Sequence, residues 1–224
     1  MKLVIIKYNA GNIQSVLYAL ERIGAEAVVT DDAAEIRSAD KVIFPGVGEA
    51  STAMDYLRDR GLDVLIRELR QPVLGICLGM QLMCSYSEEN DTECLGIFGE
   101  KVKKFEPAAG TGFAAGGGGR AGTGSGVATL KVPQIGWNNI YDLRTPLFAG
   151  VAENSYCYFV HGYYASLGDH TVATTDYVQP YSSGLYRDNF YGVQFHPEKS
   201  SAAGLRMLAN FAAICATAQV PVAR

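Results

Sequence analysis

A short cysteine motif is the first candidate for chemistry, the sequence GICLG at residues 75–79, where an apolar run meets a helical pattern. With serine in place of Cys77, this would be the G-x-S-x-G turn that carries the nucleophile of many hydrolases. The flanking glycines are needed because the nucleophile sits in a strained turn, where neighbouring side chains would collide. The N-terminus of the following helix favours a thiolate. The motif predicts Cys77 as a nucleophile, although a lone cysteine of this kind is also often a small buried hydrophobe.

A second motif lies near the C-terminus, where GVQFHPE occupies residues 192–198. A nucleophilic thiolate needs a group that moves protons near neutral pH, and histidine titrates there. In an extended chain His196 and Glu198 project to the same face, with Pro197 fixing the backbone between them. A carboxylate beside the imidazole would hold its tautomer and complete a nucleophile–base–orienter set. The alternative is an ordinary surface turn without function.

A third motif is the turn PGVG at residues 45–48, which also follows an apolar run. At the carboxyl end of a parallel strand such a turn lies where ligands bind in open α/β folds. The backbone N–H groups of Gly46, Val47 and Gly48 can rotate inward there to hold a developing oxyanion. The N–H of Leu78, directly after the expected nucleophile, would be the other donor. Taken alone, the motif is equally consistent with a plain tight turn.

The elements that position these motifs follow from hydrophobic spacing. In the first eighty or so residues, short apolar runs typical of strands covered on both faces alternate with stretches of helical periodicity. The expected strands cover residues 3–8, 25–30, 41–46 and 72–77. The expected helices cover residues 13–23, 49–60, 62–69 and 78–86, the first of them capped by Asn12. This alternation predicts an open, mostly parallel α/β sheet.

The second half of the chain has shorter strands and more turns, which predicts an antiparallel or mixed extension of the sheet. The expected strand regions are 96–105, 136–143, 155–165, 170–177 and 184–195, and a final helix covers 203–216. Residues 107–126 are rich in glycine and alanine, and we expect a flexible loop there. A phosphate-binding glycine loop is the alternative, but the segment lacks the Lys-Ser/Thr ending of a P-loop. We expect residues 1–224 to form one domain.

Composition excludes several classes of protein. Of 224 residues, 48% are hydrophobic and 19% charged, so the chain can bury a large core. The net charge of −4 gives no basic excess for binding nucleic acid. No apolar run reaches the length needed to span a membrane. The odd number of scattered cysteines, five, is typical of reduced thiols in the cytoplasm, and with three histidines we expect no metal.

Together these motifs resemble the class I glutamine amidotransferases, which carry a Cys-His-Glu triad in this order. The finer resemblance is to the family of glutaminase subunits of imidazole glycerol phosphate synthases, and it covers nearly the whole chain except residues 107–126. It rests on the segments AGNIQSV (10–16), FPGVG (44–48), KVPQIGWN (131–138), YFVHGYYA (158–165) and GVQFHPEKSS (192–201). The resemblance implies an open α/β sheet with helices on both faces and no cofactor.

The resemblance also implies roles for further residues. Gln81 and Glu89 are expected to contact L-glutamine, as are Gly162 and Tyr163 through backbone atoms. Three more positions match the partner interface and the ammonia exit of the family: Asn12, Tyr158 and Lys199. Gly162 stands where relatives often carry Ser or Thr, and Gln134 where they often carry His.

The activity that the resemblance implies is hydrolysis of glutamine, with ammonia passed to a separate cyclase barrel. That partner would form imidazole glycerol phosphate and an aminoimidazole carboxamide ribotide in histidine biosynthesis. Three alternatives remain at this point: another class I glutamine amidotransferase, a thiol-dependent α/β hydrolase, and a non-catalytic binding subunit. The acid of an α/β hydrolase precedes its histidine, whereas Glu198 follows His196, which argues against that class. His170, between Asp169 and Thr171, is expected to be a solvated turn residue.

Overall fold

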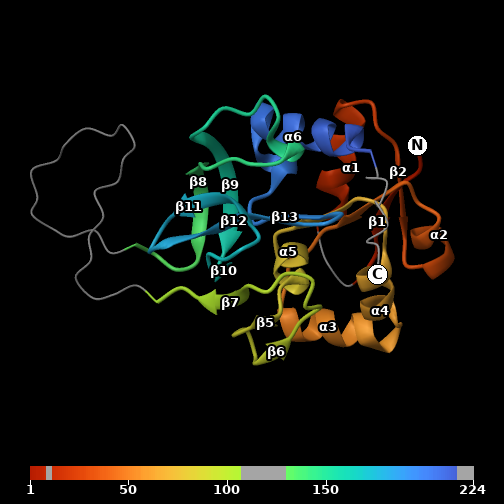
Figure 1. Cartoon of the computed structure of the whole chain (residues 1–224), viewed down its shortest axis with the longest axis horizontal. Coiled ribbons are helices and arrows are strands. Elements are labelled where there is room, and N and C mark those ends of the chain that lie inside the picture. Colours follow the sequence, from red (N-terminus) through yellow and green to blue (C-terminus); the bar gives the residue numbers. More distant parts are fainter. Residues whose placement is uncertain (9–11, 107–129, 216–224) are drawn as a thin grey trace, which may run out of the picture.

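A computed structural model of the chain describes residues 1–8, 12–106 and 130–215 (Figure 1). The loop expected at 107–126 lies outside the described residues. Parallel strands form one half of the main sheet, in the spatial order β2-β1-β3-β4-β13. These strands are β1 (Leu3–Ile6), β2 (Ala27–Thr30), β3 (Lys41–Phe44), β4 (Val73–Ile76) and β13 (Phe190–Val193). The strand nearest the C-terminus therefore lies beside β4 in the middle of the sheet.

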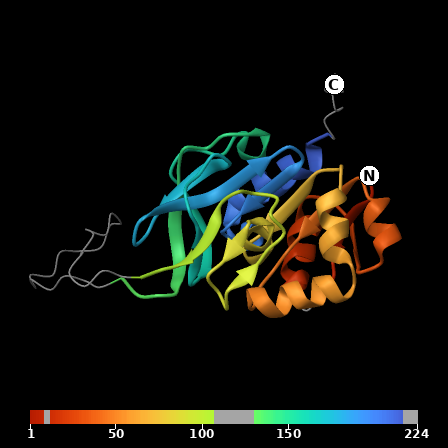
Figure 2. The ribbon, with the colours of Figure 1, turned by 60° about the horizontal axis from the view of Figure 1, so that its bottom comes forward.

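The other half of the sheet continues from β13 through mostly antiparallel pairs in the order β12-β10-β7-β5-β6, while β11 pairs with β12. These strands are β12 (Pro180–Arg187), β10 (Tyr163–Ala165), β7 (Lys101–Lys104), β5 (Tyr86–Ser87), β6 (Thr92–Glu93) and β11 (Thr171–Asp176). Two long strands, β8 (Gln134–Ile140) and β9 (Ser155–His161), form a separate antiparallel ribbon. They were expected to extend the main sheet, and in this respect the prediction was wrong. Figure 2 shows the ribbon and helix α2 at opposite ends of the molecule.

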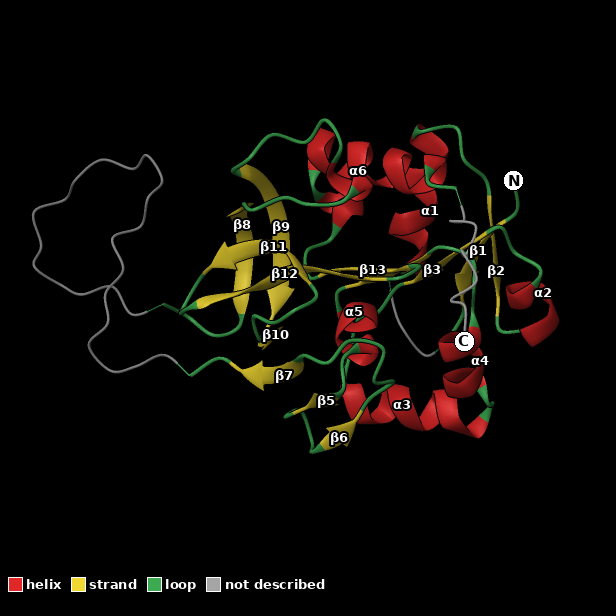
Figure 3. Ribbon diagram, in the orientation of Figure 1, coloured by secondary structure: helices red, strands yellow, loops and turns green. Residues whose placement is uncertain are grey.

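Helices cover both faces of the parallel half, in two layers on either side of the strands (Figure 3). Helices α1 (Ile13–Arg22) and α6 (Ser201–Ala213) pack together on one face. The other face carries α2 (Ala33–Arg37), α3 (Ala50–Asp59), α4 (Leu62–Glu68) and α5 (Leu78–Met83). Two short 3-10 turns, η1 (Pro146–Phe148) and η2 (Pro197–Lys199), complete the described elements.

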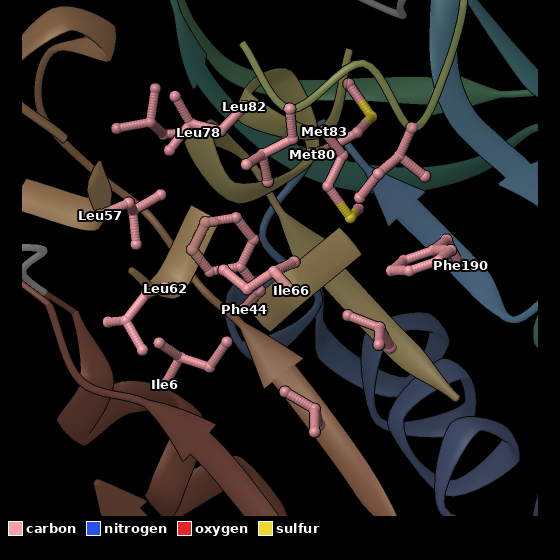
Figure 4. Close-up of a cluster of buried hydrophobic side chains, with 14 of the residues drawn as sticks. Ile6, Phe44, Leu57, Leu62, Ile66, Leu78, Met80, Leu82, Met83 and Phe190 are labelled. Carbon is pink, nitrogen blue, oxygen red and sulfur yellow. The ribbon is translucent and has the colours of Figure 1, made fainter. Parts of the chain in front are cut away.

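The hydrophobic residues of the strands alternate between two cores, as the pleat of a doubly covered sheet requires. In β1, Val4 and Ile6 enter the core under α3, α4 and α5, whereas Leu3 and Ile5 enter the core under α1 and α6. Figure 4 shows the first core, in which Ile6 and side chains of β3, the helices and β13 point toward one another. Both faces of the strands are thereby buried, which explains their uninterrupted apolar sequence.

Two local expectations need correction. Asn12 precedes α1, but it has a left-handed backbone (φ 77°), and its side chain makes no capping hydrogen bond. Helix α2 was not predicted, although Asp32 caps it by accepting the N–H of Glu35. None of the helices in the described part of the chain is both long and apolar enough to span a membrane.

Candidate active site

Cys77 lies in the turn between β4 and α5, with a strained backbone (φ 53°) that places it above the end of the strand. The turn packs closely against neighbouring segments, and the two flanking glycines leave room for this because they have no side chain. A Cβ on Gly79 would overlap the backbone carbonyl of Phe44, and one on Gly75 would overlap the end of the Met83 side chain. The prediction of a tight, glycine-dependent turn at Cys77 is confirmed.

His196 reaches the same place because β13 runs parallel to β4. Ile76 and Val193, the last residues of these strands, are paired in register, so the chains that follow them emerge side by side. His196 lies three residues beyond Val193, and Glu198 follows in η2. The Nδ1 atom of His196 is 2.8 Å from Oε1 of Glu198, and both side chains are buried.

Asn12 donates a hydrogen bond from its side-chain amide to the same Glu198 oxygen, Oε1. This contact replaces the capping bond that the sequence predicted and ties the start of α1 to the carboxylate. A carboxylate oxygen can only accept hydrogen bonds, so Oε1 accepts from His196 as well as from Asn12. Its contact with Nδ1 of His196 therefore requires a proton on Nδ1. The second ring nitrogen is then left for Cys77.

Burial and two neighbouring groups act on the pKa of His196 in opposite directions. Burial lowers its pKa, but the hydrogen bond and charge of Cys77, followed by those of Glu198, raise the pKa of His196 to about 10. An imidazolium held between a sulfur and a carboxylate is the form that can donate a proton to a leaving group.

The PGVG turn lies beside Cys77, and two of its backbone carbonyl groups accept hydrogen bonds from neighbouring residues. The Tyr8 hydroxyl donates to the Pro45 carbonyl (2.6 Å), and the Leu78 N–H donates to the Gly46 carbonyl (3.3 Å). The Leu78 donor is therefore engaged in this arrangement. Before it can hold an oxyanion, the carbonyl of Gly46 must turn away from it.

A cavity of about 400 Å³ opens over these groups. Eleven of the residues predicted from the sequence line it: Asn12, Val47, Gly48, Cys77, Leu78, Gln81, Glu89, Gly162, Tyr163, His196 and Lys199. Three others lie just outside the lining: Gly46 in the PGVG turn, Glu198 behind His196, and Tyr158 beside Lys199. The predicted residues thus gather around one cavity.

The residues expected to bind substrate already have partners. Glu89 accepts the N–H of Ala50 at the start of α3 (2.8 Å), and burial raises the pKa of Glu89. The carbonyl of Tyr163 accepts the amide of Gln81 (2.9 Å), and the carbonyl of Gly162 accepts the N–H of Phe105 (3.1 Å). These two carbonyls are engaged within the protein. Among the described residues, a Cβ added at position 162 would lie within 4 Å of the ring of Pro133 alone, at 3.8 Å.

Sequence reasoning overlooked Gln194, which is fully buried beneath the cavity. Its Nε2 lies 3.6 Å from the Cys77 sulfur, and its Oε1 accepts from Gln81 (2.9 Å). The available signal was a polar side chain between Val193 and Phe195 in an otherwise apolar strand end.

The other histidines and thiols do not join the triad. His170 lies in a turn, as expected, but it is not fully solvated, because its side chain is 24% exposed and its Nδ1 lies 2.9 Å from the buried carboxylate of Glu100. Burial raises the pKa of Cys84, and it raises that of Cys94 and Cys157 to about 12, so these thiols stay protonated. Within the described ranges, no cluster of three or more His, Cys, Asp or Glu residues could hold a metal ion.

A buried imidazole–carboxylate pair beside a cysteine, at the carboxyl ends of parallel strands, defines a cysteine-dependent acyl-transfer site on an open α/β fold. Comparisons with known proteins narrow this class. The family described as glutamine amidotransferase class-I matches residues 4–215. A crystal structure of a glutamine amidotransferase has a TM-score of 0.66 at 17% identity, covering 94% of this chain and 99% of that one. A glutamine amidotransferase from Thermotoga maritima has a TM-score of 0.58 at 16% identity, covering 95% and 83%. At these identities the structures support the fold alone.

Sequence relatives are much more similar. Imidazole glycerol phosphate synthase subunit HisH of Bacteroides fragilis is 53% identical over 94% of this chain and 98% of its own length. The protein of the same name from Shewanella loihica is 43% identical, covering 93% and 88%. The chain belongs to the class I glutamine amidotransferase family and, within it, to the family of HisH subunits. The resemblance and the fold class predicted from the sequence are both confirmed.

Proposed function

We propose that this chain is the glutaminase subunit of an imidazole glycerol phosphate synthase. It hydrolyses L-glutamine to glutamate and ammonia and passes the ammonia to a cyclase subunit. The cyclase uses it to form imidazole glycerol phosphate and aminoimidazole carboxamide ribotide in histidine biosynthesis. The observation that carries the proposal is the convergence of Cys77, His196 and Glu198 at the 400 Å³ cavity. The whole chain acts as one amidotransferase domain, since β1 and β13, from its two ends, belong to one sheet.

In the proposed reaction, the Cys77 thiolate attacks the side-chain amide carbon of glutamine and forms a tetrahedral intermediate. His196 donates its proton to the departing nitrogen, so that ammonia leaves and a glutamyl thioester remains. The neutral imidazole then removes a proton from water, which attacks the thioester and releases glutamate and the thiolate. Glu198 holds the imidazole in place and stabilises its positive form through both half-reactions.

The developing oxyanion needs donors at the PGVG turn. Turning the Gly46–Val47 peptide removes the Gly46 carbonyl from the Leu78 N–H and directs the Val47 N–H into the cavity. Losing one such donor costs roughly 3 kcal/mol of barrier, a factor of about 100 in rate. The turn therefore provides a two-state control of the glutaminase, and we propose that the loaded cyclase favours the active state.

Substrate specificity is assigned to the other wall of the cavity. Glu89 supplies a negative charge for the α-ammonium group of glutamine, and Gln81 lies beside the reacting amide. The segment at Gly162 and Tyr163 closes this wall near the α-carboxylate.

The outer face of the β8–β9 ribbon is proposed as the surface for the cyclase. Ile135 and Trp137 are 64% and 53% exposed there, and Tyr156 and Val160 are also exposed. Apolar side chains gathered on one strand pair beside a catalytic cavity are typical of a protein interface. Val160 also lines the cavity, so the interface and the ammonia exit are continuous.

Lys199, Tyr158 and Asn12 connect this surface to the triad. The Lys199 ammonium lies 6.0 Å from the ring centroid of Tyr158, whose carbonyl accepts the N–H of His196. A partner carboxylate that pairs with Lys199 would act directly beside Glu198. We therefore expect Lys199→Ala to lower cyclase-stimulated glutamine hydrolysis more than the basal rate, as steady-state kinetics of the subunit alone and in complex will show.

The state of the cysteines indicates the cellular compartment in which the protein acts. All five cysteines are free thiols, and Cys77 must stay reduced to react. We assign the reaction to the cytoplasm, where thiols remain reduced.

The decisive test is glutamate release from glutamine, measured with the chain alone and with a cyclase subunit loaded with its nucleotide. We expect slow release by the chain alone and faster release in the complex, coupled one-to-one to cyclised product. The absence of glutamate release in both samples would refute the proposal. A subunit that is as fast alone as in the complex would refute the two-state control but not the triad.

A further inference from the structure

A buried chain of hydrogen bonds connects the wall of the cavity to the sulfur of Cys77. The Gln81 amide nitrogen donates to the Tyr163 carbonyl and to Oε1 of Gln194, both at 2.9 Å. Nε2 of Gln194 in turn lies 3.6 Å from the Cys77 sulfur. Gln194 is completely buried and Gln81 is 5% exposed, so water does not compete for these bonds.

The direction of this chain is fixed at its far end. The Tyr163 carbonyl can only accept, and it also accepts Nδ1 of His161 at 2.7 Å. The end of Gln81 that faces this carbonyl must therefore be its NH₂ group. That group also faces Gln194, which must present its oxygen there and its own NH₂ group to Cys77. The opposite orientation of Gln194 would place two NH₂ groups together and a carbonyl lone pair against the sulfur.

The donor at the sulfur offsets an unfavourable neighbour. Besides Gln194 and His196, the Cys77 sulfur contacts the Val160 carbonyl at 3.9 Å, an acceptor that favours the protonated thiol. A hydrogen bond to a charged acceptor is about twice as strong as one to a neutral acceptor, so an N–H group aimed at sulfur favours the thiolate. This preference is largest in a buried site of low dielectric constant.

We propose that Gln194 is a positioning residue that stabilises the reactive thiolate of Cys77 by donating an N–H group to its sulfur, and that Gln81 orients Gln194 for this task. The inference rests on the proposed function only in taking Cys77 as the nucleophile. Three other titratable groups act on this sulfur: His196 beyond β13, Tyr8 beyond β1 and Tyr181 on β12. All three are retained in the variants below, so a change in thiolate reactivity reports on Gln194.

The test measures how fast iodoacetamide alkylates Cys77 as a function of pH, with the modified residue identified by mass spectrometry. In Gln194→Met the shape is kept and the donor is lost. We expect the midpoint of the alkylation profile to rise by about one pH unit, the worth of one hydrogen bond to a charged group, with up to tenfold slower modification on the acid side of the midpoint. Gln194→Glu keeps an acceptor for Gln81 but places a carboxylate at the sulfur, and its profile should move further in the same direction.

The matched control is Gln71→Met, which removes an amide that donates to the Ile36 carbonyl (2.9 Å) before β4, at the opposite end of that strand from Cys77. Its profile should coincide with that of the unaltered protein. With a cyclase partner present, Gln194→Met should lower kcat for glutamine hydrolysis about tenfold and leave KM within twofold, since the donor acts on the nucleophile.

Profiles of folded Gln194 variants that match the unaltered protein would overturn the inference. Failure of both replacements to fold, checked by circular dichroism, would also overturn it, because the role of Gln194 would then be structural. The proposed function fails in a different way, namely by an absence of glutamine hydrolysis in the unaltered protein, whatever its alkylation profile.

Discussion

Replacing Glu198 with glutamine removes one negative charge from the triad while leaving its shape. In the native site, Oε1 of Glu198 accepts from Nδ1 of His196 at 2.8 Å and from the Asn12 amide. The Asn12 amide is a donor, so it selects the oxygen of the substituted amide and keeps that oxygen toward His196. The variant therefore retains the proton on Nδ1 and loses only the charge.

The expected magnitude follows from the type of hydrogen bond. A buried hydrogen bond to a charged partner contributes about 1.5–3 kcal/mol, and a neutral one about 1 kcal/mol. The difference of about 1.4 kcal/mol corresponds to a factor of ten. Since Glu198 is among the groups that raise the pKa of His196 to about 10, Glu198→Gln lowers that pKa. We expect the alkaline limb of the profile to move to lower pH by about one unit, because the imidazolium is the form that releases ammonia. We also expect kcat at pH 7 to fall about tenfold, because the imidazolium that forms when His196 removes a proton from water loses its charged partner.

Stability gives an independent measurement of the same pair. A histidine whose pKa is raised on folding stabilises the protein fully below its ordinary pKa of about 6.5, and this contribution is lost as the pH rises toward 10. The loss between these limits should be smaller in Glu198→Gln, as measured by urea unfolding across this pH range.

The assay is glutamate release in the complex from pH 6 to 10, with Glu68→Gln as the control for an identical substitution. Glu68 pairs with Arg37 on the surface at 3.7 Å, where both side chains are more than half exposed. Glu68→Gln should therefore change neither kcat nor the position of the alkaline limb. An unmoved alkaline limb in Glu198→Gln, with kcat within twofold of the unaltered protein, would refute the assigned role of Glu198.

Three further outcomes are expected. Cys77→Ser should abolish glutamine hydrolysis but leave cyclisation with added ammonia intact, as product formation from each nitrogen source will show, because a buried serine forms no alkoxide at neutral pH. Gly79→Ala should destabilise the protein by more than 3 kcal/mol in urea unfolding, since its Cβ overlaps the Phe44 carbonyl, whereas Gly99→Ala, whose nearest neighbour is at 3.8 Å, should be neutral within about 0.5 kcal/mol. Burial lowers the pKa of His161 to about 4, so stability should fall by about 3 kcal/mol as the pH drops from 6.5 to 4, and this part of the slope should disappear in His161→Asn.

The parallel half of the fold was predictable because it depends on local patterns. Apolar runs at 3–8 and 72–77 mark strands that are buried on both faces, and the cores on the two sides accept their alternate residues. The glycines around Cys77 indicate the turn in the sequence, because the packing of α5 against β3 leaves no room for a side chain at Gly79. Family resemblance supplied the remaining site residues, which no local rule would have collected.

What the sequence did not reveal depends on contacts between distant segments. The capping role predicted for Asn12 failed because Glu198, 186 residues away, binds its amide more directly than the helix end does. His170 was expected in solvent, but it pairs with Glu100, 70 residues away. Gln194 looked like an ordinary polar residue because its partner at the sulfur comes from another strand. Side-chain contacts between segments far apart in the sequence, rather than local propensity, decided each of these cases.

The position of β13 has a consequence for synthesis on the ribosome. Until residues 190–193 emerge, β4 has a neighbour on one side only, and its apolar sequence forms an unpaired sheet edge. The last strand to be translated then enters the centre of the sheet, joins the two halves, and delivers His196 to Cys77 in the same step. A nascent or truncated chain therefore holds its cysteine without its base. Glutamine hydrolysis therefore cannot begin before residues 190–198 have joined the sheet.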